Sequence, residues 1–365
     1  MPIAESFREQ SFVLRGKLSE ERKKPKCVVL FSGGLDSSIA AALLKNLGME
    51  VFAVHFLNGF SVSKKRETLS LEKENDFLKN LQKFANKLQI PLKIVDISEE
   101  FLEVILNPSF GYGANINPCV DCKIFMLKKA KKIMEEIGAD IVVTGEVLGQ
   151  RPMSQRLDTL NIIERESGLK GKLLRPLSAK ALKETEMEKS KLIDREKLLN
   201  ITGRARKIQN QIAKKMGIEN AIAPTSGCCL LTDPGYAKRV KDKFANNKKR
   251  LGLEDFELLM IGRHFRLAEN LKFIVGRNLK ENIALEKYSK DKMRFEVVDA
   301  KGPLGISDEG IPNNEQIDIC AGIILRYSDV EKSRESEVKI SINGENIKIV
   351  NVKPLNDYEI RSFRI

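Results

Sequence analysis

The stretch Val28–Ser38 reads VVLFSGGLDSS, and it decides the fold of the first part of the chain. Cys27–Phe31 is an apolar run that favours a β-strand, whereas the residues of Ile39–Leu44 follow a helical pattern. Ser32-Gly33-Gly34 lies between these two runs. The sequence therefore predicts a strand, a tight turn and a helix in succession.

The turn has the composition of an anion-binding loop. Gly33 and Gly34 allow a positive φ and a close approach of the backbone to a ligand, and the first amides of the next helix point outward with the positive end of its dipole. Hydroxyl groups are added by Ser32, Ser37 and Ser38. Asp36 cannot itself attract phosphate, so its carboxylate indicates a bound Mg²⁺ that bridges it to the phosphates. The alternative is a glycine-rich turn in which Asp36 only caps the helix.

The string SGGLDSS resembles the SGGxDS pyrophosphate loop of the ATP pyrophosphatases, which activate a substrate oxygen as its adenylate. It lacks the G-K-[ST] of a Walker loop, so hydrolysis of a γ-phosphate is not implied. A glycine pair alone would be weak support, whereas the whole string is specific.

The length and composition point to a chain with two domains. The chain has 365 residues, 42% of them hydrophobic, which is enough for real cores. No apolar run approaches the roughly 18–20 residues that a membrane span needs, and the start, MPIAESFREQSF, lacks the layout of a signal peptide. We therefore expect a cytoplasmic protein without a membrane partner.

Charge favours a polyanionic partner. The formal net charge is +13 and the pI is about 9.3, as expected for a protein that binds nucleic acid. Lysine-rich solvated helices are the alternative explanation. The only histidines are His55 and His264, so the chain offers few residues for catalysis by histidine. His55 ends an apolar strand pattern, and we place it at the rim of the candidate nucleotide site or in the core.

Strand and helix patterns alternate along the first two thirds of the chain, which predicts an α/β fold with a parallel sheet. After an extension of residues 1–24, strands are expected at 49–56, 92–97, 139–145 and 173–177, helices at 72–88 and 123–137, and a charged helical stretch at 180–216. Ligands bind outside the carboxyl ends of such a sheet. The pyrophosphate loop, Cys119–Cys122 and Glu146–Gln155 should therefore share one rim.

A second, smaller α+β module is expected after a basic helical linker. We assign residues 25–235 to the ATP-binding domain, 236–262 to the linker and 263–365 to this module. Its expected strands are 263–267, 272–275, 294–298, 317–326, 338–342 and 347–352, with a helix at 279–289.

Six cysteines in a cytoplasmic chain do not form a disulfide scaffold. Cys119 and Cys122 stand at i and i+3 at a helix entrance, where they can share one ligand, and Cys228 and Cys229 follow far along the chain. No second CxxC or nearby histidine completes a tetrahedral zinc site. Three thiolates could hold a 4Fe–4S cluster with one open iron. The rival chemistry uses Cys122 and Cys229 as a persulfide and resolving pair.

The motifs SGGLDSS, NPCVDCK, TGEVLGQRPMSQ, LRPLS and GCCLLTDP together resemble the tRNA thiouridine synthetases of the pyrophosphate-loop superfamily, near the 4-thiouridine and 2-thiouridine enzymes. The resemblance covers roughly residues 26–240. It implies an adenine nucleotide alpha hydrolase-like, Rossmann-like fold. It also implies adenylation of a uridine carbonyl oxygen by ATP, followed by displacement of AMP by sulfur.

The resemblance also implies residue roles. Pyrophosphate and Mg²⁺ would be bound by Ser32, Gly33, Gly34, Asp36, Ser37 and Ser38, and Gly145, Gln150 and Ser154 would lie near the nucleotide. Cys119, Cys122 and Cys229 match the three-cysteine pattern of iron–sulfur members. Cys229 is preferred to its neighbour Cys228 because the family string reads GCLLTDP.

The chain departs from standard 4-thiouridine synthetases at both ends. It has no region long enough for an RNA-binding THUMP domain and no rhodanese domain, which favours the cluster route. Instead, Lys272–Asn282 (KFIVGRNLKEN) resembles the opening of the RNA-binding NFACT-R module. The resemblance implies tRNA as partner, with sulfide or a cysteine desulfurase or persulfide carrier as sulfur donor. The modified uridine, its ring oxygen and a homodimer stay open. The rival hypotheses are an amidating or ligating enzyme on the same loop and a non-catalytic RNA-binding protein.

Overall fold

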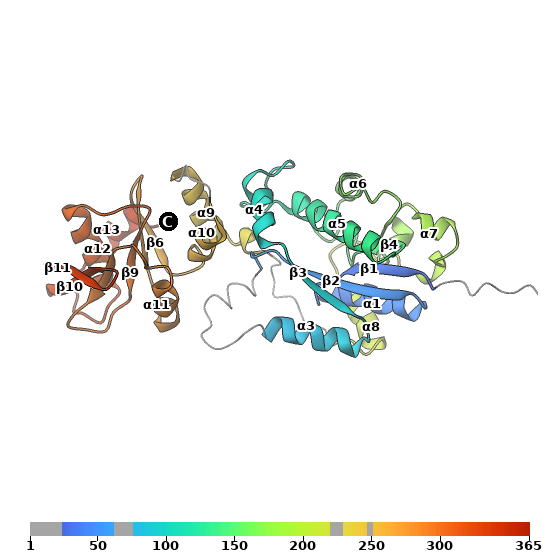
Figure 1. Cartoon of the computed structure of the whole chain (residues 1–365), viewed down its shortest axis with the longest axis horizontal. Helices are drawn as coiled ribbons and strands as arrows, with labels where there is room; N and C mark the ends of the chain where they lie inside the picture. The colour runs from blue at the N-terminus through green and yellow to red at the C-terminus, as the bar shows by residue number, and fades with distance from the viewer. Residues whose placement is uncertain (1–23, 62–75, 220–228, 247–250) are drawn as a thin grey trace, which may run out of the picture.

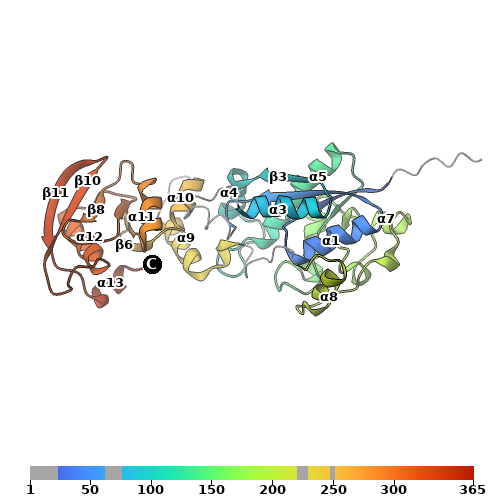
Figure 2. The ribbon, with the colours of Figure 1, turned by 90° about the horizontal axis from the view of Figure 1, so that it is seen from below.

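The computed structural model describes residues 24–61, 76–219, 229–246 and 251–365. The described parts lie along one long axis, with a parallel sheet towards one end, an antiparallel sheet towards the other and two helices between them (Figures 1 and 2). The predicted combination of an α/β domain with a smaller C-terminal module is confirmed.

The first sheet is parallel throughout and has the order β3-β2-β1-β4-β5. Its strands are β1 (Lys26–Leu30), β2 (Glu50–Leu57), β3 (Leu92–Asp96), β4 (Ile141–Val143) and β5 (Leu173–Leu174). Strands β2 and β3 lie on one side of β1, and β4 and β5 lie on the other. The direction of the crossover connections therefore reverses between β1 and β4. Ligands of such sheets bind outside the carboxyl ends of the strands at that point.

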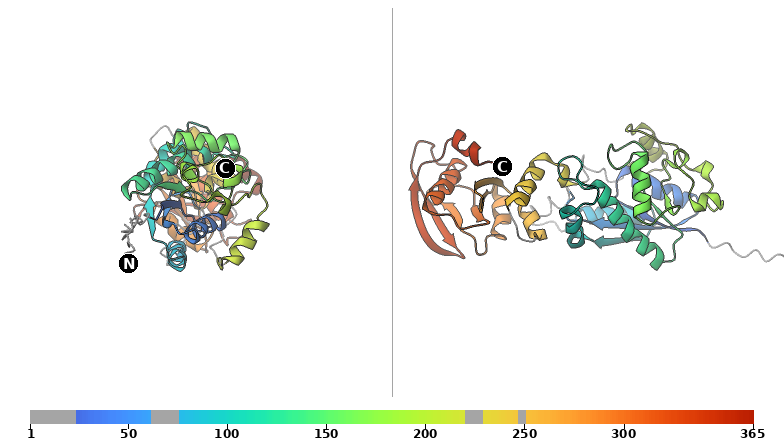
Figure 3. Two further views of the ribbon diagram at one scale, coloured as in Figure 1. Left: turned by 90° about the vertical axis from the view of Figure 1, so that its right-hand side faces the viewer. Right: turned by 90° about the horizontal axis from the view of Figure 1, so that it is seen from above.

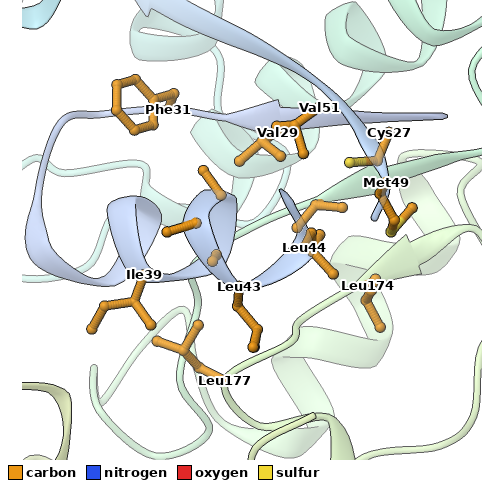
Figure 4. Close-up of a cluster of buried hydrophobic side chains, with 14 of the residues drawn as sticks. Cys27, Val29, Phe31, Ile39, Leu43, Leu44, Met49, Val51, Leu174 and Leu177 are labelled. Atoms are coloured by element: carbon orange, nitrogen blue, oxygen red, sulfur yellow. The ribbon is translucent and has the colours of Figure 1, made fainter. Parts of the chain in front are cut away.

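Helices cover both faces of this sheet because β1 is apolar on both sides. Cys27 and Val29 face the cluster that contains Leu44 of α1, and Val28 faces the cluster on the other side (Figure 4). The first face is covered by α1 (Leu35–Asn46), α3 (Asp76–Lys87) and α8 (Lys207–Lys215), and the second by α5 (Cys119–Glu136) and α6 (Leu157–Glu166). Two of these helices, α6 and α8, were not predicted with these bounds.

The charged stretch 180–216 is not the continuous helical region that its composition predicts. It contains only short elements before α8: η1 (Ala179–Ala181), α7 (Glu186–Lys189) and η2 (Arg195–Lys197). The guanidinium of Arg195 donates to the carbonyls of Ala179 and Leu182 and pairs with Glu188. Charged side chains here tie irregular backbone together instead of lining a solvated helix face, which explains the wrong prediction.

Two helices, α9 (Pro234–Asn246) and α10 (Leu253–Leu258), join the sheets (Figure 3). On one side they pack into an apolar cluster with Phe60, Phe101 of α4 (Ser98–Leu106) and Leu230 of η3 (Leu230–Thr232). On the other side, Leu258 packs with Ile274 and Ile306 of the second sheet. Segments of both domains therefore pack against the linker helices.

A buried ionic cluster, here called the Lys243 cluster, also joins α9 to the second sheet. Lys243, 3% exposed, lies 3.1 Å from Asp255, 3.5 Å from Asp308 and 2.9 Å from Glu309. The cluster is completed by the pairs Arg266–Asp242, Arg266–Glu309, Lys272–Asp242 and Lys292–Asp308. Its members come from α9, α10 and the strands and turns of the second sheet, so it is a structural joint.

The second sheet has the order β11-β10-β8-β9-β7-β6, with antiparallel pairing. Its strands are β6 (Arg263–Ala268), β7 (Leu271–Val275), β8 (Arg294–Val297), β9 (Gly305–Asp308), β10 (Ser336–Ile342) and β11 (Glu345–Val352). Its helices are α11 (Leu279–Glu286), α12 (Asn314–Arg326) and α13 (Asp357–Phe363). The strand β9 and the helix α13 were not predicted, whereas α10 falls within the predicted helical linker.

The predicted strand at residues 317–326 is wrong, because this segment belongs to α12. Its apolar, β-branched residues resemble a buried strand, but they line the side of a helix that packs on the sheet. The helix begins with a capping box, in which Asn313 accepts from the amide of Gln316 and Gln316 accepts from that of Asn313. That box was the sequence signal that distinguished the two structures.

No helix in the part of the chain that the structure describes is both long and apolar enough to cross a bilayer.

Candidate nucleotide and sulfur site

The loop between β1 and α1 has the predicted backbone. Gly33 has a φ of 71°, in the left-handed region that favours glycine. The Oγ atoms of Ser37 and Ser38 donate to the Gly34 carbonyl at 3.0 and 2.9 Å, and the Oγ of Ser32 lies 3.1 Å from that of Ser37. No described side chain caps α1 at Gly34, so the reading of Asp36 as a helix cap is wrong. The outward amides at the start of α1 remain available to an anion.

The end of β4 lies directly against this loop. A Cβ on Gly145 would come within 2.5 Å of the Asp36 carbonyl carbon and of the Ser37 amide nitrogen, so only glycine fits. A few residues later, Nε2 of Gln150 donates to Oδ2 of Asp36 at 3.1 Å. The fold thus brings Asp36 together with Gly145 and Gln150, although more than 100 residues separate Asp36 from either of them in the sequence.

Asp36 keeps one oxygen atom for another partner. Its Oδ1 is buried and has no hydrogen-bond partner among the described residues. An unpaired buried carboxylate oxygen is costly unless a ligand completes it. Beside outward helix amides, this donor set fits Mg²⁺, which takes one or two carboxylates together with phosphate oxygens.

The Glu146–Gln155 segment is buried at both ends, whereas Gly149, Arg151 and Pro152 in its middle are exposed. The amide of Gly149 donates to the Gln155 carbonyl at 2.7 Å. Ser154, a predicted nucleotide-binding residue, is 1% exposed, and Gln155 beside it has a buried Oε1 without a hydrogen-bond partner among the described residues. Ser154 therefore belongs to the wall of the site, and its role towards a nucleotide stays a prediction.

A second buried ionic cluster, here called the Glu146 cluster, lies behind this segment. Oε2 of Glu146 accepts from Thr144 and from Nε of Arg175, both at 3.1 Å, and Oε1 lies 3.4 Å from the Lys123 ammonium. Arg175 also pairs with Glu164 at 3.2 Å. Burial alone would raise the pKa of Glu146, but Lys123 and Arg175 outweigh burial and lower that pKa. Glu146 is therefore an anion held between two cations.

The Glu146 cluster contains functional candidates that the sequence analysis missed. Lys123 directly follows Cys122, so the cluster links the start of α5 to the segment that holds Asp36. Glu146 and Arg175 both stand inside quoted motifs, TGEVLGQ and LRPLS. In the sequence, Glu146 and Arg175 each stand alone among apolar neighbours, and this pattern predicts that they form a buried ion pair.

Each of the two histidines donates a hydrogen bond to a backbone carbonyl. Nδ1 of His55 donates to the Phe31 carbonyl at 2.8 Å, and its ring lies 5.5 Å from that of Phe77. Burial lowers the pKa of His55, although the bond to Phe31 opposes this. His264, 2% exposed, donates from Nε2 to the Ile261 carbonyl. His55 thus joins the ends of β1 and β2 beside the loop, and its contact with a nucleotide stays a prediction.

The first thiol pair lies inside a helix and not ahead of it. The helix α5 begins at Cys119, four residues before the predicted start, so Cys119 and Cys122 occupy its first turn. The carboxylate of Asp121, in the same turn, accepts from the amides of Ser109 and Phe110. The preceding glycine-rich loop is thereby fastened to the helix that carries the thiols.

Cys229 packs against the same apolar cluster as Cys122 of this pair. Cys122 and Cys229 both pack against the apolar cluster that contains Phe60 and Phe101. The turn after Cys229 is tied to the loop before α5, because Nδ2 of Asn115 donates to the Thr232 carbonyl at 2.9 Å. The loop also touches Glu146–Gln155, here called the nucleotide segment, since a Cβ on Gly113 would lie 2.2 Å from Sδ of Met153. One loop therefore connects all three segments.

The predicted three-thiol metal site is not assembled. Within the described ranges, no group of three or more His, Cys, Asp or Glu side chains is positioned to hold a metal ion. The choice between Cys228 and Cys229 falls partly outside the described residues, because Cys228 is not among them. A 4Fe–4S cluster on Cys119, Cys122 and Cys229 therefore stays a prediction.

Comparison with known proteins agrees with this division. Residues 23–202 match the family described as "Thiamine biosynthesis protein (ThiI)", and residues 262–364 match the family described as "NFACT protein RNA binding domain".

Several relatives have names that concern tRNA thiolation. The chain is 26% identical over 363 residues to a tRNA-specific 2-thiouridylase of Clostridium tetani, which spans 93% of this chain and 89% of the relative. It is 34% identical over 154 residues to a probable tRNA sulfurtransferase of Thermococcus kodakarensis, covering 42% of this chain and 36% of the relative. The matched part spans about half of another such protein, from Lysinibacillus sphaericus, at 28% identity (64% of this chain, 49% of the relative).

Among solved structures, a 4-thiouridine synthetase in complex with RNA and ATP aligns over 65% of this chain and 52% of its own, at 22% identity and a TM-score of 0.35.

Proposed function

We propose that the chain is an ATP-dependent tRNA sulfurtransferase, because residues 23–202 match the ThiI family and residues 262–364 match the NFACT RNA-binding family. The observation that carries the proposal is the meeting of Gly145 and Gln150 with Asp36 at the pyrophosphate loop. The same proposal assigns residues 25–235 to thiolation, 236–262 to the linker and 263–365 to RNA binding. With tRNA and ATP as substrates, the reaction belongs in the cytoplasm.

The activation step uses the loop between β1 and α1. The uridine carbonyl oxygen attacks the α-phosphorus of ATP in line, an oxygen–phosphorus bond forms, and pyrophosphate leaves. The fixed amides at the start of α1 and the hydroxyl of exposed Ser32 stabilise the charge that develops on pyrophosphate. Asp36 would hold Mg²⁺ through Oδ1, and the ion would neutralise phosphate charge. Gln150 holds the other oxygen of Asp36 and so fixes the carboxylate.

In the sulfur step, sulfur attacks the activated ring carbon, a carbon–sulfur bond forms, and AMP leaves. Sulfide from a donor can do this directly. In the persulfide route, a cysteine desulfurase or persulfide carrier first transfers its terminal sulfur to Cys122 or Cys229. That sulfur attacks the ring carbon, the other thiolate then cleaves the sulfur–sulfur bond and releases the thiolated base, and two external thiols reduce the resulting disulfide. Their packing against one apolar cluster supports this pair. No step is assigned to a 4Fe–4S cluster, because the described thiols do not form a ready set of three ligands.

The activation step is tested by replacing Asp36. Asp36→Ala should lower the release of AMP and pyrophosphate on addition of ATP, unmodified tRNA and a sulfide donor by about 100-fold or more, as loss of a metal-binding group in phosphoryl chemistry predicts. Asp140→Ala is the matched control, because this exposed carboxylate precedes β4 at the opposite end of the sheet. Near-normal thiolation by Asp36→Ala would refute the proposal.

The sulfur route is tested by single Cys→Ser variants at 119, 122 and 229, with Cys320→Ala in buried α12 as control. Loss of thiolation in the Cys122 and Cys229 variants alone, in protein without iron, supports the persulfide pair. Loss in all three, with about four irons per chain after anaerobic purification, supports the cluster. Full activity with sulfide in all variants would assign the step to free sulfide. The mass of the wild-type chain in solution tests whether the chain forms the homodimer that the sequence leaves open.

A further inference from the structure

The segment Thr202–Lys207 runs alongside the nucleotide segment, although the function proposed above gives it no role. Leu148 and Thr202 form a parallel β-bridge, and the Gly203 amide donates to the Leu148 carbonyl at 2.7 Å. A Cβ on Gly149 would lie 3.5 Å from the Gly203 amide nitrogen. The backbones of the two segments are therefore in direct contact.

This pairing places a cation beside the pyrophosphate loop. Because the bridge is parallel, both chains leave it in the same direction. Gln150 follows Leu148 by two residues and holds Asp36 through its side-chain amide. Arg204 follows Thr202 by two residues and is exposed. Arg204 thus emerges on the same rim as Gln150, outside the buried loop.

Two further cations follow at once. Arg206 and Lys207 are exposed and stand at the N-cap and first residue of α8, whose first turn has no acidic residue. No ion pair or hydrogen bond joins Arg204, Arg206 or Lys207 to any described side chain. Positive charge at a helix N-terminus is unfavourable, because it meets the positive end of the dipole. Folding alone therefore does not account for this charge, which suits an external anion.

We propose that Arg204, Arg206 and Lys207 bind the phosphodiester backbone of RNA on either side of the nucleotide that is modified. The inference rests on the proposed function. The target base must leave its stack to reach the rim, while its flanking phosphates stay outside, where these exposed side chains are. The phosphates of ATP have a different partner, the buried loop with its amides. Phosphate contacts set the register of a nucleic acid on a protein.

The test compares two double variants of the full chain. Arg204→Gln/Arg206→Gln removes two of the three cations, and Lys214→Gln/Lys215→Gln removes the same charge from exposed positions at the other end of α8. Affinity for unmodified tRNA is measured across salt concentrations without turnover, and affinity for ATP is measured without RNA. The arginine variant should bind tRNA about tenfold or more weakly, and its salt dependence should fall by about 0.7–0.9 per lost contact.

The outcomes separate the proposal from its rivals. Unchanged ATP affinity in the arginine variant and near-wild-type tRNA binding in the lysine variant support the proposal. Weaker ATP binding with an unchanged salt dependence for tRNA would overturn it and assign the cations to the nucleotide. An equal loss in both variants would overturn it as an effect of overall charge. Because these are binding measurements, inactivity of the wild-type chain would refute the proposed function and leave this result intact.

Discussion

Two buried ionic clusters, one around Glu146 and one around Lys243, use the same chemistry in opposite arrangements. In the Glu146 cluster one acid is held between two cations, Lys123 and Arg175. In the Lys243 cluster one cation is held among three acids, Asp255, Asp308 and Glu309. The first lies between the thiol-bearing helix and the nucleotide segment, and the second lies between the linker helix and the second sheet.

The difference shows how to tell a positioning cluster from a structural one. Glu146 stands next to Gly145, which touches the pyrophosphate loop, and its partner Lys123 stands next to Cys122. Every described contact of Lys243 serves to attach α9 to its neighbours. Disturbing the Glu146 cluster should therefore affect thiolation before stability, whereas disturbing the Lys243 cluster should do the reverse.

The largest effect on stability is expected for Lys243→Met. Removing the cation leaves Asp308 and Glu309 with only Lys292 and Arg266 as their cation partners. Breaking a buried ion pair in this way costs about 3–5 kcal/mol. Urea denaturation at pH 7 measures the loss. Lys241→Met, at an exposed position of α9, is the control and should change stability little. Equal stability of the two variants would show that the Lys243 cluster is not a structural joint.

A smaller loss of stability, with a larger loss of activity, is expected for Glu146→Gln. The amide preserves an acceptor for Arg175 but leaves the Lys123 ammonium without its anion, at a cost of about 2–3 kcal/mol. Thiolation should fall at least tenfold at a temperature where the variant is fully folded, because the start of α5 loses its tie to the nucleotide segment.

The readout that separates positioning from stability is the KM for ATP against kcat. The Glu146→Gln variant should mainly lose kcat, since the pyrophosphate loop itself is unchanged. Glu135→Gln, in an exposed pair of α5 with Lys131, is the control. Full activity of Glu146→Gln would show that the Glu146 cluster has only a structural role, as the Lys243 cluster has.

The acid dependence of stability should distinguish the clusters further. Burial alone would raise the pKa of Asp308, but Lys292 and Lys243 outweigh burial and lower it. A lowered carboxyl pKa gives stability that is present above the unfolded value of about 4 and is lost as the pH falls through the folded value. In Lys243→Met, Asp308 loses one of its two cation partners and keeps only Lys292, so its pKa rises. Its deficit against wild type in urea should therefore shrink as the pH falls from about 5 towards about 3, through the unfolded value of about 4. A constant deficit over this range would contradict this assignment.

The smallest effect is expected at the loop that joins the three segments of the site. A Cβ on Gly113 meets Sδ of Met153 at 2.2 Å, so Gly113→Ala should cost about 1–3 kcal/mol by overpacking. Met153→Ala should recover most of that loss in the double variant, as measured by a double-mutant cycle. Additive losses would mean that the two side chains do not touch in solution.

The sequence predicted the fold best where pattern and turn chemistry agree. The alternation around Val28–Ser38 gave the central strand, the loop and the first helix, because an apolar strand ending in two glycines admits few other structures. The segment at 317–326 was misread because Ile-rich runs satisfy both a buried strand and a buried helix. Only the capping box of Asn313 and Gln316 separates the two.

For the site, the sequence pointed to residues but not to their pairing. Asp36, Gly145 and Gln150 were named individually, and their contact follows from the parallel order of β1 and β4, which no local pattern specifies. The contact of Arg204 with the same rim depends on a single bridge across more than 50 residues. The periodicity of the sequence does not predict such long-range pairing, because the packing of irregular segments determines it.

The linker helices have a consequence for any RNA that the second domain binds. They pack into the apolar cluster at the carboxyl end of the first sheet and into that of the second sheet, and the Lys243 cluster fastens the second contact. The separation between the two sheets is thereby set by packed side chains and not by a loose tether. This joint would hold an RNA bound by the second domain at a fixed distance from the pyrophosphate loop. Only a nucleotide at the matching distance in the folded RNA could then reach that loop.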